Sequence, residues 1–191
     1  MENILNSSYN MNAEETHLKG CFVISPKLHH DDRGFFFESY NKKSFEKAID
    51  QSVNFVQDNH SVSNKGVLRG LHFQTGDFAQ AKLLRVIKGS VLDVCVDIRR
   101  NSDTFGQYFS IILDNIDHKQ LFIPRGFAHG FLVLEDDTIF NYKCDNYYSK
   151  DHESGLLFND SALQIDWNFP LNNIILSEKD KQLPTFESLL K

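Results

Sequence analysis

Short runs of alternating apolar and polar residues make up most of the chain from residue 20 onward, and glycine, proline or acidic turns separate them. Strand-like runs of this kind lie at 21–24, 35–40, 55–59, 66–74, 82–87, 91–99, 108–113, 121–124, 127–134 and 138–143. Helical periodicity is confined to 41–50 and to two C-terminal stretches, 177–181 and 186–191. Many short strands with short helices only at the flanks predict a mainly β fold, built as an antiparallel barrel or jelly roll.

Turn, cap and aromatic residues add three local predictions. Ser44 is the predicted N-cap of the first helix. A turn around Gly89 predicts that 82–87 and 91–99 pair as a hairpin. The run Phe35–Phe37 is aromatic enough to form a strand that is buried on both faces or that lies across a subunit boundary.

Alternation also assigns side chains to faces, because successive residues of a strand point to opposite sides. In one strand Leu68, Gly70, His72 and Gln74 share a side, and Arg69, Leu71 and Phe73 share the other. In a second strand Leu92, Val94, Val96 and Ile98 share a side, and Val91, Asp93, Cys95 and Asp97 share the other. A histidine aligned with a glycine faces a place where something approaches the backbone closely.

Length and charge narrow the classes of function. The chain has 191 residues, enough for one domain with a sizeable core. Residues 1–16 are polar and without periodicity, so we expect a mobile N-terminal arm before a single domain at 17–191. The formal net charge of −6 argues against a nucleic-acid partner, because phosphate backbones require a basic surface.

The cellular compartment follows from segments that the sequence lacks and from its cysteines. We see no apolar run of about 18 residues for a membrane span and no secretory signal. Cys21, Cys95 and Cys144 are odd in number and far apart, which is typical of buried thiols in a reducing compartment. The sequence therefore predicts a cytoplasmic protein.

Five features are difficult to explain by packing alone. They are His72 in its strand, Arg33 in a polar loop, Lys82 at the start of an apolar strand, His129 between glycines, and Tyr142 in a strand-like run. Each alone has an ordinary explanation, since a histidine packs in cores, a loop arginine is solvated and a lysine extends its amine to water. Together, in an acidic protein, they predict a site for a small anionic molecule, with histidine and tyrosine available for proton transfer.

Other classes of site lack their motifs. The chain has no H-x-H pair of the kind that binds metal in small barrels, and a third ligand beside His72 and His129 is not indicated, so we predict no metal site. Phosphate-binding, dinucleotide-binding and hydrolase motifs are also absent from the sequence. The pattern alone therefore predicts a small β-barrel with a polar pocket, and it names no reaction.

A family resemblance goes further. The blocks DDRGFFFESY, FVQDNHSVSNKGVLRGLHFQ, AQAKLLRV, GSVLDVCVDIRRNSDTFGQY, IPRGFAHGFLVL, YKCDNYYS and LSEKD resemble the dTDP-4-dehydrorhamnose 3,5-epimerases, in order, from about residue 20 to 184. The resemblance implies a cupin-like jelly-roll barrel and a homodimer without metal or organic cofactor. It also implies dTDP-4-dehydro-6-deoxy-D-glucose as substrate and dTDP-4-dehydro-L-rhamnose, a precursor for polysaccharide, as product.

The same resemblance assigns roles to residues. His72 of RGLHFQ would be the general base, and Asp180 of LSEKD would orient it. Tyr142 would return a proton from the opposite face, and Lys82 would stabilise the enolate oxygen. The residues implied to line the nucleotide-sugar site are Arg33, Glu38, Gln57, Asp58, Asn59, Arg69, His129, Glu153 and Lys179.

Three alternatives remain at this stage. A single-site 3- or 5-epimerase of a related nucleotide 4-keto sugar would keep every residue named above. A non-catalytic sugar-nucleotide-binding barrel would not need His72, Tyr142 and Asp180 together. A metal-dependent cupin oxygenase is disfavoured by the missing H-x-H pair.

Overall fold

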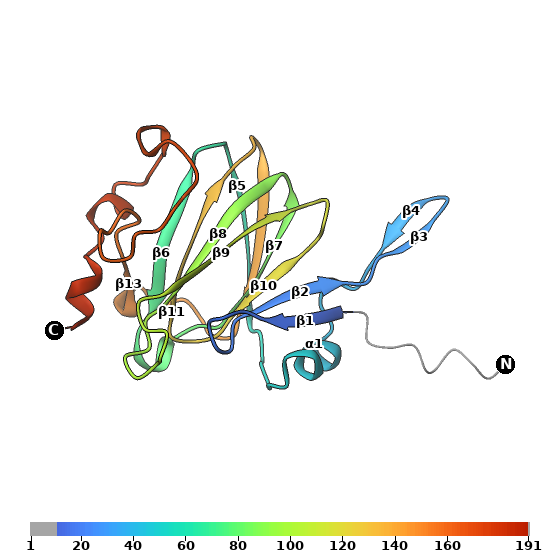
Figure 1. The fold of residues 1–191 in the computed structure, drawn as a ribbon. Helices are drawn as coiled ribbons and strands as arrows, with labels where there is room; N and C mark the ends of the chain where they lie inside the picture. Colours follow the sequence, from blue (N-terminus) through green and yellow to red (C-terminus); the bar gives the residue numbers. More distant parts are fainter. Residues whose placement is uncertain (1–10, 191) are drawn as a thin grey trace.

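Two antiparallel sheets enclose the core of the protein (Figure 1). The computed structural model describes residues 11–190. The first sheet has the order β1 (Met11–Glu15), β2 (Phe22–Pro26), β10 (Gln120–Ile123), β7 (Lys82–Lys88), β12 (Thr138–Cys144), β5 (Gln57–Ser63). The second has the order β13 (Glu153–Gly155), β6 (Leu68–Gln74), β11 (Phe127–Val133), β8 (Ser90–Asp97), β9 (Tyr108–Asp114). The predicted mainly β jelly roll is confirmed.

Short elements surround the two sheets. They are the hairpin of β3 (His29–Asp31) and β4 (Gly34–Phe36), the helix α1 (Lys42–Ile49), and the 3₁₀ helices η1 (Gly76–Phe78), η2 (Lys150–His152), η3 (Leu171–Asn173), η4 (Asp180–Gln182) and η5 (Phe186–Leu190). The predicted C-terminal helices are thus short 3₁₀ helices of three and five residues. No helix within 11–190 is long and apolar enough to cross a membrane.

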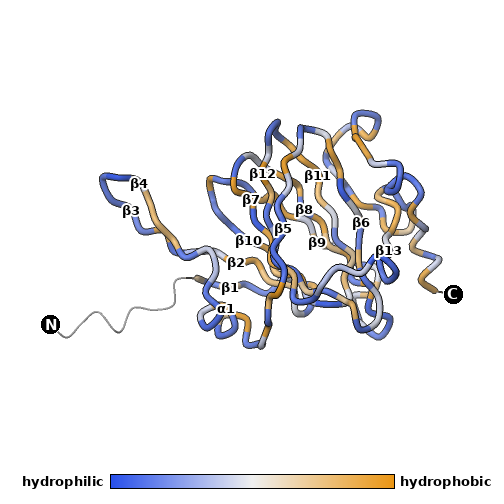
Figure 2. Tube along the Cα trace, turned by 180° about the vertical axis from the view of Figure 1, so that it is seen from behind, coloured by the Kyte–Doolittle hydropathy of each residue, from blue (hydrophilic) through white to orange (hydrophobic). Residues whose placement is uncertain are grey.

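Strand alternation builds the core in layers. Hydrophobic positions concentrate in the inner strands and give way to hydrophilic ones at the turns, while the edge strand β5 is largely hydrophilic (Figure 2). The inward faces of both sheets pack on each other through residues such as Leu84, Phe140 and Cys95. Leu92 and Val94, on the other side of β8, pack beneath the C-terminal segment. The predicted faces of this strand are therefore confirmed.

The helix α1 begins one turn earlier than its predicted cap. Asn41 has an extended backbone, and its side-chain oxygen accepts a hydrogen bond from Ser44 N at 3.2 Å. Ser44 therefore lies inside the first turn, and its prediction as N-cap was wrong. Phe45 and Ile49 fill the space between the helix and the first sheet. Asn is as good a cap as Ser, so capping propensity alone could not choose between them.

The predicted hairpin of β7 and β8 is also wrong, because the two strands belong to different sheets. β7 pairs with β10 and β12, whereas β8 pairs with β11 and β9. Between them Gly89 takes φ +81°, and a Cβ there would lie 2.3 Å from Thr138 Oγ1. The glycine thus lets the chain cross between sheets in a crowded place. The alternation of apolar and polar residues specifies the two faces of a strand, but it does not determine which strand pairs with it.

The predicted N-terminal arm is wrong for residues 11–15, and residues 1–10 lie outside the described residues. Met11 to Glu15 form β1, which pairs with β2 in register from Met11↔Pro26 to Glu15↔Phe22. Met11 is buried in the cluster beneath α1, while Asn12 and Glu14 face water. A polar edge strand needs only one apolar face, so its composition resembles that of a disordered segment.

The hairpin of β3 and β4 projects away from the two sheets (Figure 1). Phe35 is 50% and Phe36 is 68% exposed, so this aromatic strand is not buried on both faces. The ring of His118 lies 4.8 and 5.0 Å from those of Phe35 and Phe37, and the ring of His30 lies 5.8 Å from that of Phe35. Exposed aromatic area of this kind is typical of an interaction surface.

The thiols lie as the sequence predicts. Cys21, Cys95 and Cys144 are buried and free. Cys21 Sγ and Cys95 Sγ are 3.7 Å apart in the core between the sheets.

Candidate active site

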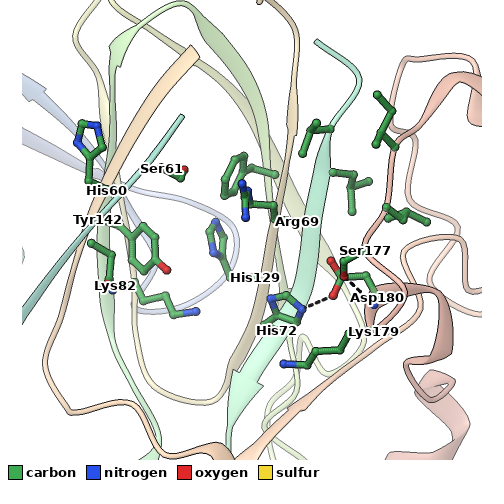
Figure 3. A pocket seen from close by; sticks show the side chains of 16 residues that line it. His60, Ser61, Arg69, His72, Lys82, His129, Tyr142, Ser177, Lys179 and Asp180 are labelled. Carbon is green, nitrogen blue, oxygen red and sulfur yellow. Dashed lines mark hydrogen bonds and ion pairs between the residues drawn. The ribbon is translucent and has the colours of Figure 1, made fainter. Parts of the chain in front are cut away.

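A cavity of about 550 Å³ lies between the two sheets, with β5, β7 and β12 on one side and β6 and β11 on the other (Figure 3). A second cavity of about 350 Å³ shares Asn59, His72, Lys82 and Tyr142 with it, so the two form one continuous site. Of the predicted residues, Asn59, Arg69, His72, Lys82, His129, Tyr142, Lys179 and Asp180 line the first cavity, and Gln57 and Glu153 line the second. The two sheets and the C-terminal segment thus bring together residues that are up to 123 positions apart in sequence, from Gln57 to Asp180.

His72 and Asp180 form one wall of the site. His72 Nε2 lies 2.7 Å from Asp180 Oδ1, and the two side chains are 28% and 5% exposed. Burial raises the pKa of Asp180, but hydrogen bonds from His72, Gly70 N and Ser177 and the charge of His72 outweigh it and hold the pKa below its ordinary value. The carboxylate is therefore ionised and accepts the Nε2–H bond, which leaves Nδ1 of His72 able to take a proton.

Lys82 and Tyr142 form the facing wall, on adjacent strands β7 and β12 (Figure 3). Burial lowers the pKa of Lys82, against the opposing effect of nearby anionic groups, and burial raises the pKa of Tyr142. Neither side-chain polar atom has a hydrogen-bond partner within 11–190, and neither is sealed from the cavity. The site therefore offers a phenol and an amine, both free to bind a ligand.

A β-bulge brings Arg69 into the same cavity as His72. The pairs His129↔His72 and Phe131↔Arg69 place two steps of β11 opposite three steps of β6. Because β6 holds one extra residue there, alternation breaks and both side chains line the cavity. The prediction that Arg69 and His72 face opposite sides was therefore wrong. Arg69 also donates to Ser63 Oγ from Nε at 3.3 Å and from Nη2 at 3.1 Å.

Polar side chains connect across the outer part of the site. Glu153 Oε2 accepts a hydrogen bond from Tyr148 Oη at 2.7 Å and lies 2.5 Å from Lys179 Nζ. Gln57 Oε1 accepts from Tyr148 N at 3.0 Å, and Gln57 Nε2 donates to Asn59 Oδ1 at 3.0 Å. Sequence reasoning missed Tyr148, whose only signal is a pair of tyrosines in the loop after β12.

Three predicted residues do not line this cavity. Asp58 points to the opposite face of β5 from its neighbours Gln57 and Asn59, and its Oδ2 lies 2.7 Å from Lys143 Nζ. Arg33 is on the projecting hairpin and pairs with Asp31. Glu38, just after the hairpin, accepts from Asn41 Nδ2 at 3.1 Å. Within one chain, Asp58, Arg33 and Glu38 therefore lie outside this cavity.

His129 has a partner that the sequence analysis did not assign. Asp93 Oδ2 and Oδ1 lie 2.9 and 3.1 Å from His129 Nε2, and both side chains are buried. The signal was present, because Asp93 shares the inward face of its strand with Cys95. Ser177 was also missed, and its Oγ accepts a hydrogen bond from Asp180 N at 3.1 Å.

The donor set of the site favours anion binding and proton transfer. Within the described part of the chain, no three His, Cys, Asp or Glu side chains gather as a metal site would require. Instead a histidine–carboxylate pair faces a phenol, with an amine between them in the cavity lining. Such an arrangement can remove a proton from one face of a ligand, stabilise the resulting oxyanion, and return a proton to the other face.

Comparisons with known proteins agree with this chemistry. A sequence profile for dTDP-4-dehydrorhamnose 3,5-epimerase matches residues 15–188. The dTDP-4-dehydrorhamnose 3,5-epimerase of Escherichia coli K12 is 48% identical over 181 residues, which cover 95% of this chain and 97% of the relative.

Solved structures are similarly close. The dTDP-4-dehydrorhamnose 3,5-epimerase of Elizabethkingia anophelis superposes with a TM-score of 0.91 at 49% identity, covering 94% of this chain and 98% of that one. The dTDP-6-deoxy-D-glucose-3,5-epimerase of Legionella pneumophila, solved in complex with dTDP-4-keto-L-rhamnose, gives a TM-score of 0.89 at 44% identity, covering 93% of each chain.

Proposed function

This chain belongs to the dTDP-4-dehydrorhamnose 3,5-epimerase family, and from that membership we propose that it epimerises dTDP-4-dehydro-6-deoxy-D-glucose at carbons 3 and 5, giving dTDP-4-dehydro-L-rhamnose. It is an isomerase of the dTDP-rhamnose pathway with a cupin-like β fold, contained in a single epimerase domain. The observation that carries the proposal is the His72–Asp180 pair facing Tyr142 and Lys82 across one cavity.

Proton removal is assigned to His72. The ketone at carbon 4 acidifies the hydrogens at carbons 3 and 5, so each can leave to a base and give an enolate. His72 Nδ1 takes the proton, and the Asp180 carboxylate stabilises the imidazolium that forms. Lys82 stabilises the enolate oxygen, whose charge develops only during the reaction, so this cation favours the transition state over the ground state.

Inversion is assigned to Tyr142. A carbon inverts only when the proton returns to the face opposite the one that lost it, which requires a second residue. The phenol of Tyr142 lies across the cavity from His72 and remains protonated because burial raises its pKa. It therefore donates to the enolate carbon from the other side.

The outer groups are assigned to the nucleotide. Arg69 and Lys179 supply positive charge for the diphosphate, which arginine and lysine bind through charge-assisted hydrogen bonds. Gln57, Asn59 and Glu153 offer hydrogen-bonding groups to the rest of the dTDP moiety. The binding of a dTDP-sugar by the relative from Legionella pneumophila supports this assignment.

We also propose that the protein works as a homodimer in the cytoplasm. The exposed aromatic residues Phe35 and Phe36 on the projecting hairpin suit a subunit interface. Arg33 and Glu38 lie on or beside the same hairpin and away from their own cavity, so a second copy could place them at its site. The three buried free thiols suit a reducing compartment.

The test is NMR of dTDP-4-dehydro-6-deoxy-D-glucose incubated with the protein in deuterated water, without added metal. We expect deuterium at both carbon 3 and carbon 5, together with the L-sugar product. Deuterium at one carbon only would identify a single-site epimerase. Binding without any exchange would overturn the proposal in favour of a binding role or another sugar.

A further inference from the structure

Asp93 adds no atom to the cavity wall, yet it holds a residue that does. Both of its oxygens approach a single nitrogen, His129 Nε2, at 2.9 and 3.1 Å. The Asp93 side chain is 0% and the His129 side chain 6% exposed. His129 lies directly opposite His72 in the pairing of β11 with β6, and its ring borders the cavity (Figure 3).

The geometry indicates which nitrogen of His129 carries the proton. A carboxylate only accepts hydrogen bonds, and two oxygens that share one nitrogen are arranged around a single N–H group. Burial lowers the pKa of His129, and the charges of Lys82 and His72 add to this, against the opposing effect of Asp93. The ring is therefore neutral at neutral pH, with its one proton on Nε2 and a lone pair on Nδ1.

That lone pair is available to a ligand. Nδ1 of His129 has no hydrogen-bond partner in the part of the chain that the structure describes. It is not sealed in protein either, since Ser61 Oγ is the one buried side-chain polar atom without a partner among these residues. Nδ1 is thus an open acceptor on a cavity that is otherwise rich in donors, with Lys82 and Arg69 able only to donate.

We propose that Asp93 is a positioning residue that holds His129 in the Nε2–H tautomer, so that Nδ1 accepts a hydrogen bond from a hydroxyl group of the sugar. This inference rests on the proposed function for the identity of the sugar. A sugar hydroxyl can donate a hydrogen bond to Nδ1. A carbonyl oxygen cannot donate, and its lone pair would repel the lone pair on Nδ1. The pair therefore rejects a sugar turned so that its ketone meets His129, and it favours the orientation in which the ketone meets Lys82.

The test reads the tautomer directly, by ¹⁵N–¹H NMR of the full chain labelled at histidine. The signals of His129 are assigned by their loss in His129→Gln. We expect a protonated Nε2 and an unprotonated Nδ1 in the wild type, and we expect the Nδ1 signal to shift when dTDP-L-rhamnose binds, a sugar that has hydroxyls and no ketone to react. A proton on Nδ1, or no shift on binding, would overturn the proposal.

The variant Asp93→Asn separates positioning from packing. Its neutral amide can donate or accept, so His129 should populate both tautomers, and kcat/KM should fall roughly 10- to 100-fold, as for other residues that orient a functional histidine. The control Asp97→Asn changes a buried carboxylate on the same strand that bonds Arg99, and it should leave the His129 signals unchanged. A loss of activity in Asp93→Asn with an unchanged tautomer would reduce Asp93 to a packing role.

The readout is independent of turnover. Failure of the wild type to exchange deuterium would contradict the proposed function while leaving the tautomer measurement intact. Conversely, normal exchange with a proton on Nδ1 would contradict only the role of Asp93.

Discussion

At the scale of single residues, the chemistry of the site depends on which side-chain atoms have a hydrogen-bond partner in the protein and which can bind a ligand. Asp180 accepts from one nitrogen of His72 and leaves the other to act, and Asp93 does the same for His129. Among the described residues, nothing pairs with the polar atoms of Tyr142 and Lys82, which are open to the cavity. The atoms to which we assign proton transfer, Nδ1 of His72 and the phenol of Tyr142, are therefore atoms without a partner among residues 11–190.

Removing the base should stop proton abstraction. We expect His72→Ala to lower kcat by roughly 10²- to 10⁴-fold, the typical contribution of a general base, while dTDP binding measured by calorimetry largely survives. The control is His17→Ala, which removes an exposed histidine between β1 and β2 that does not line the cavity. A near-wild-type rate in His72→Ala would exclude His72 from the mechanism.

Removing only the phenolic oxygen should separate the two proton transfers. Tyr142→Phe keeps the ring that packs beside Phe140, so the fold should persist. We expect deuterium exchange to outlast net inversion, because His72 can still remove and return a proton on its own face. NMR of sugar and solvent exchange measures both rates, and an equal loss of the two would count against Tyr142 as the acid.

A buried acid outside the site should control acid stability. Burial raises the pKa of Asp97, but hydrogen bonds from Arg99, Ser102 and Thr104 prevail and lower it to about 2. Since the folded pKa is depressed, this stabilisation is complete above about pH 4 and is lost as the pH falls toward 2. It amounts to about 2 kcal/mol of the free energy of unfolding.

Urea unfolding between pH 2 and pH 5 measures this effect. Asp97→Asn should show a shallower loss of stability with acid than the wild type. Asp117→Asn, at an exposed carboxylate paired with Lys119, should follow the wild type. Parallel curves for Asp97→Asn and the wild type would show that Asp97 is not responsible.

At the scale of the elements, the alternation of apolar and polar residues predicted strands and their faces reliably. It did not predict which strands pair or where the pairing is irregular. The faces of β8 and the existence of most strands were predictable, because burial on one face imposes a period of two. The partner of β7 was not, since any strand with the same pattern would satisfy the same face. The cap at Asn41 and the bulge in β6 depend on geometry that no local pattern encodes.

The site shows the same division. The residues that we propose for proton transfer, and most of the residues that line the cavity, were identified from family motifs, which carry function together with sequence. The motif does not state which of its residues point inward, and alternation from Asn59 explains why Asp58 lies on the other face of β5 in this chain. Asp93 was missed because its role depends on a contact between neighbouring strands.

The crossing between the sheets should be sensitive at one position. Gly89→Ala forces an alanine into φ +81° and sets a Cβ against Thr138, so we expect a loss of about 1–2 kcal/mol or more in the free energy of unfolding. Gly76→Ala is the matched control, with φ +58° and open space around its Cβ. The free energies of unfolding are measured by urea unfolding. Equal losses in the two variants would show that the contact with Thr138 does not make Gly89 special.

At the scale of the whole molecule, one chain builds a cavity with His72 and Asp180 on one wall and Tyr142 on the facing wall, and its β3–β4 hairpin projects away from both sheets. Phe36 at 68% exposure and Phe35 at 50% leave an aromatic surface next to charged and polar residues. This combination is expected of a face that is covered in an assembly.

A charge on that hairpin should weaken the assembly. We expect Phe36→Asp to shift the protein from dimer toward monomer in sedimentation velocity, with little change in the circular dichroism of the fold, because this side chain packs little within its own chain. Leu171→Asp changes a side chain of 56% exposure in η3, on the C-terminal segment away from the hairpin, and should leave the dimer intact. A wild-type monomer, or an unchanged dimer in Phe36→Asp, would contradict an interface at the hairpin.

The extra residue in β6 has a consequence for anyone who would transplant this chemistry into another scaffold. An idealised strand of seven residues cannot present an arginine and a histidine three positions apart to the same side. A grafted Arg69–His72 motif would therefore place one of the two side chains on the face of the sheet away from the cavity, unless the β-bulge in the pairing with β11 were copied as well. A design must therefore transfer both strands, β6 and β11, together with the β-bulge between them, because the two residues alone would not reproduce the site.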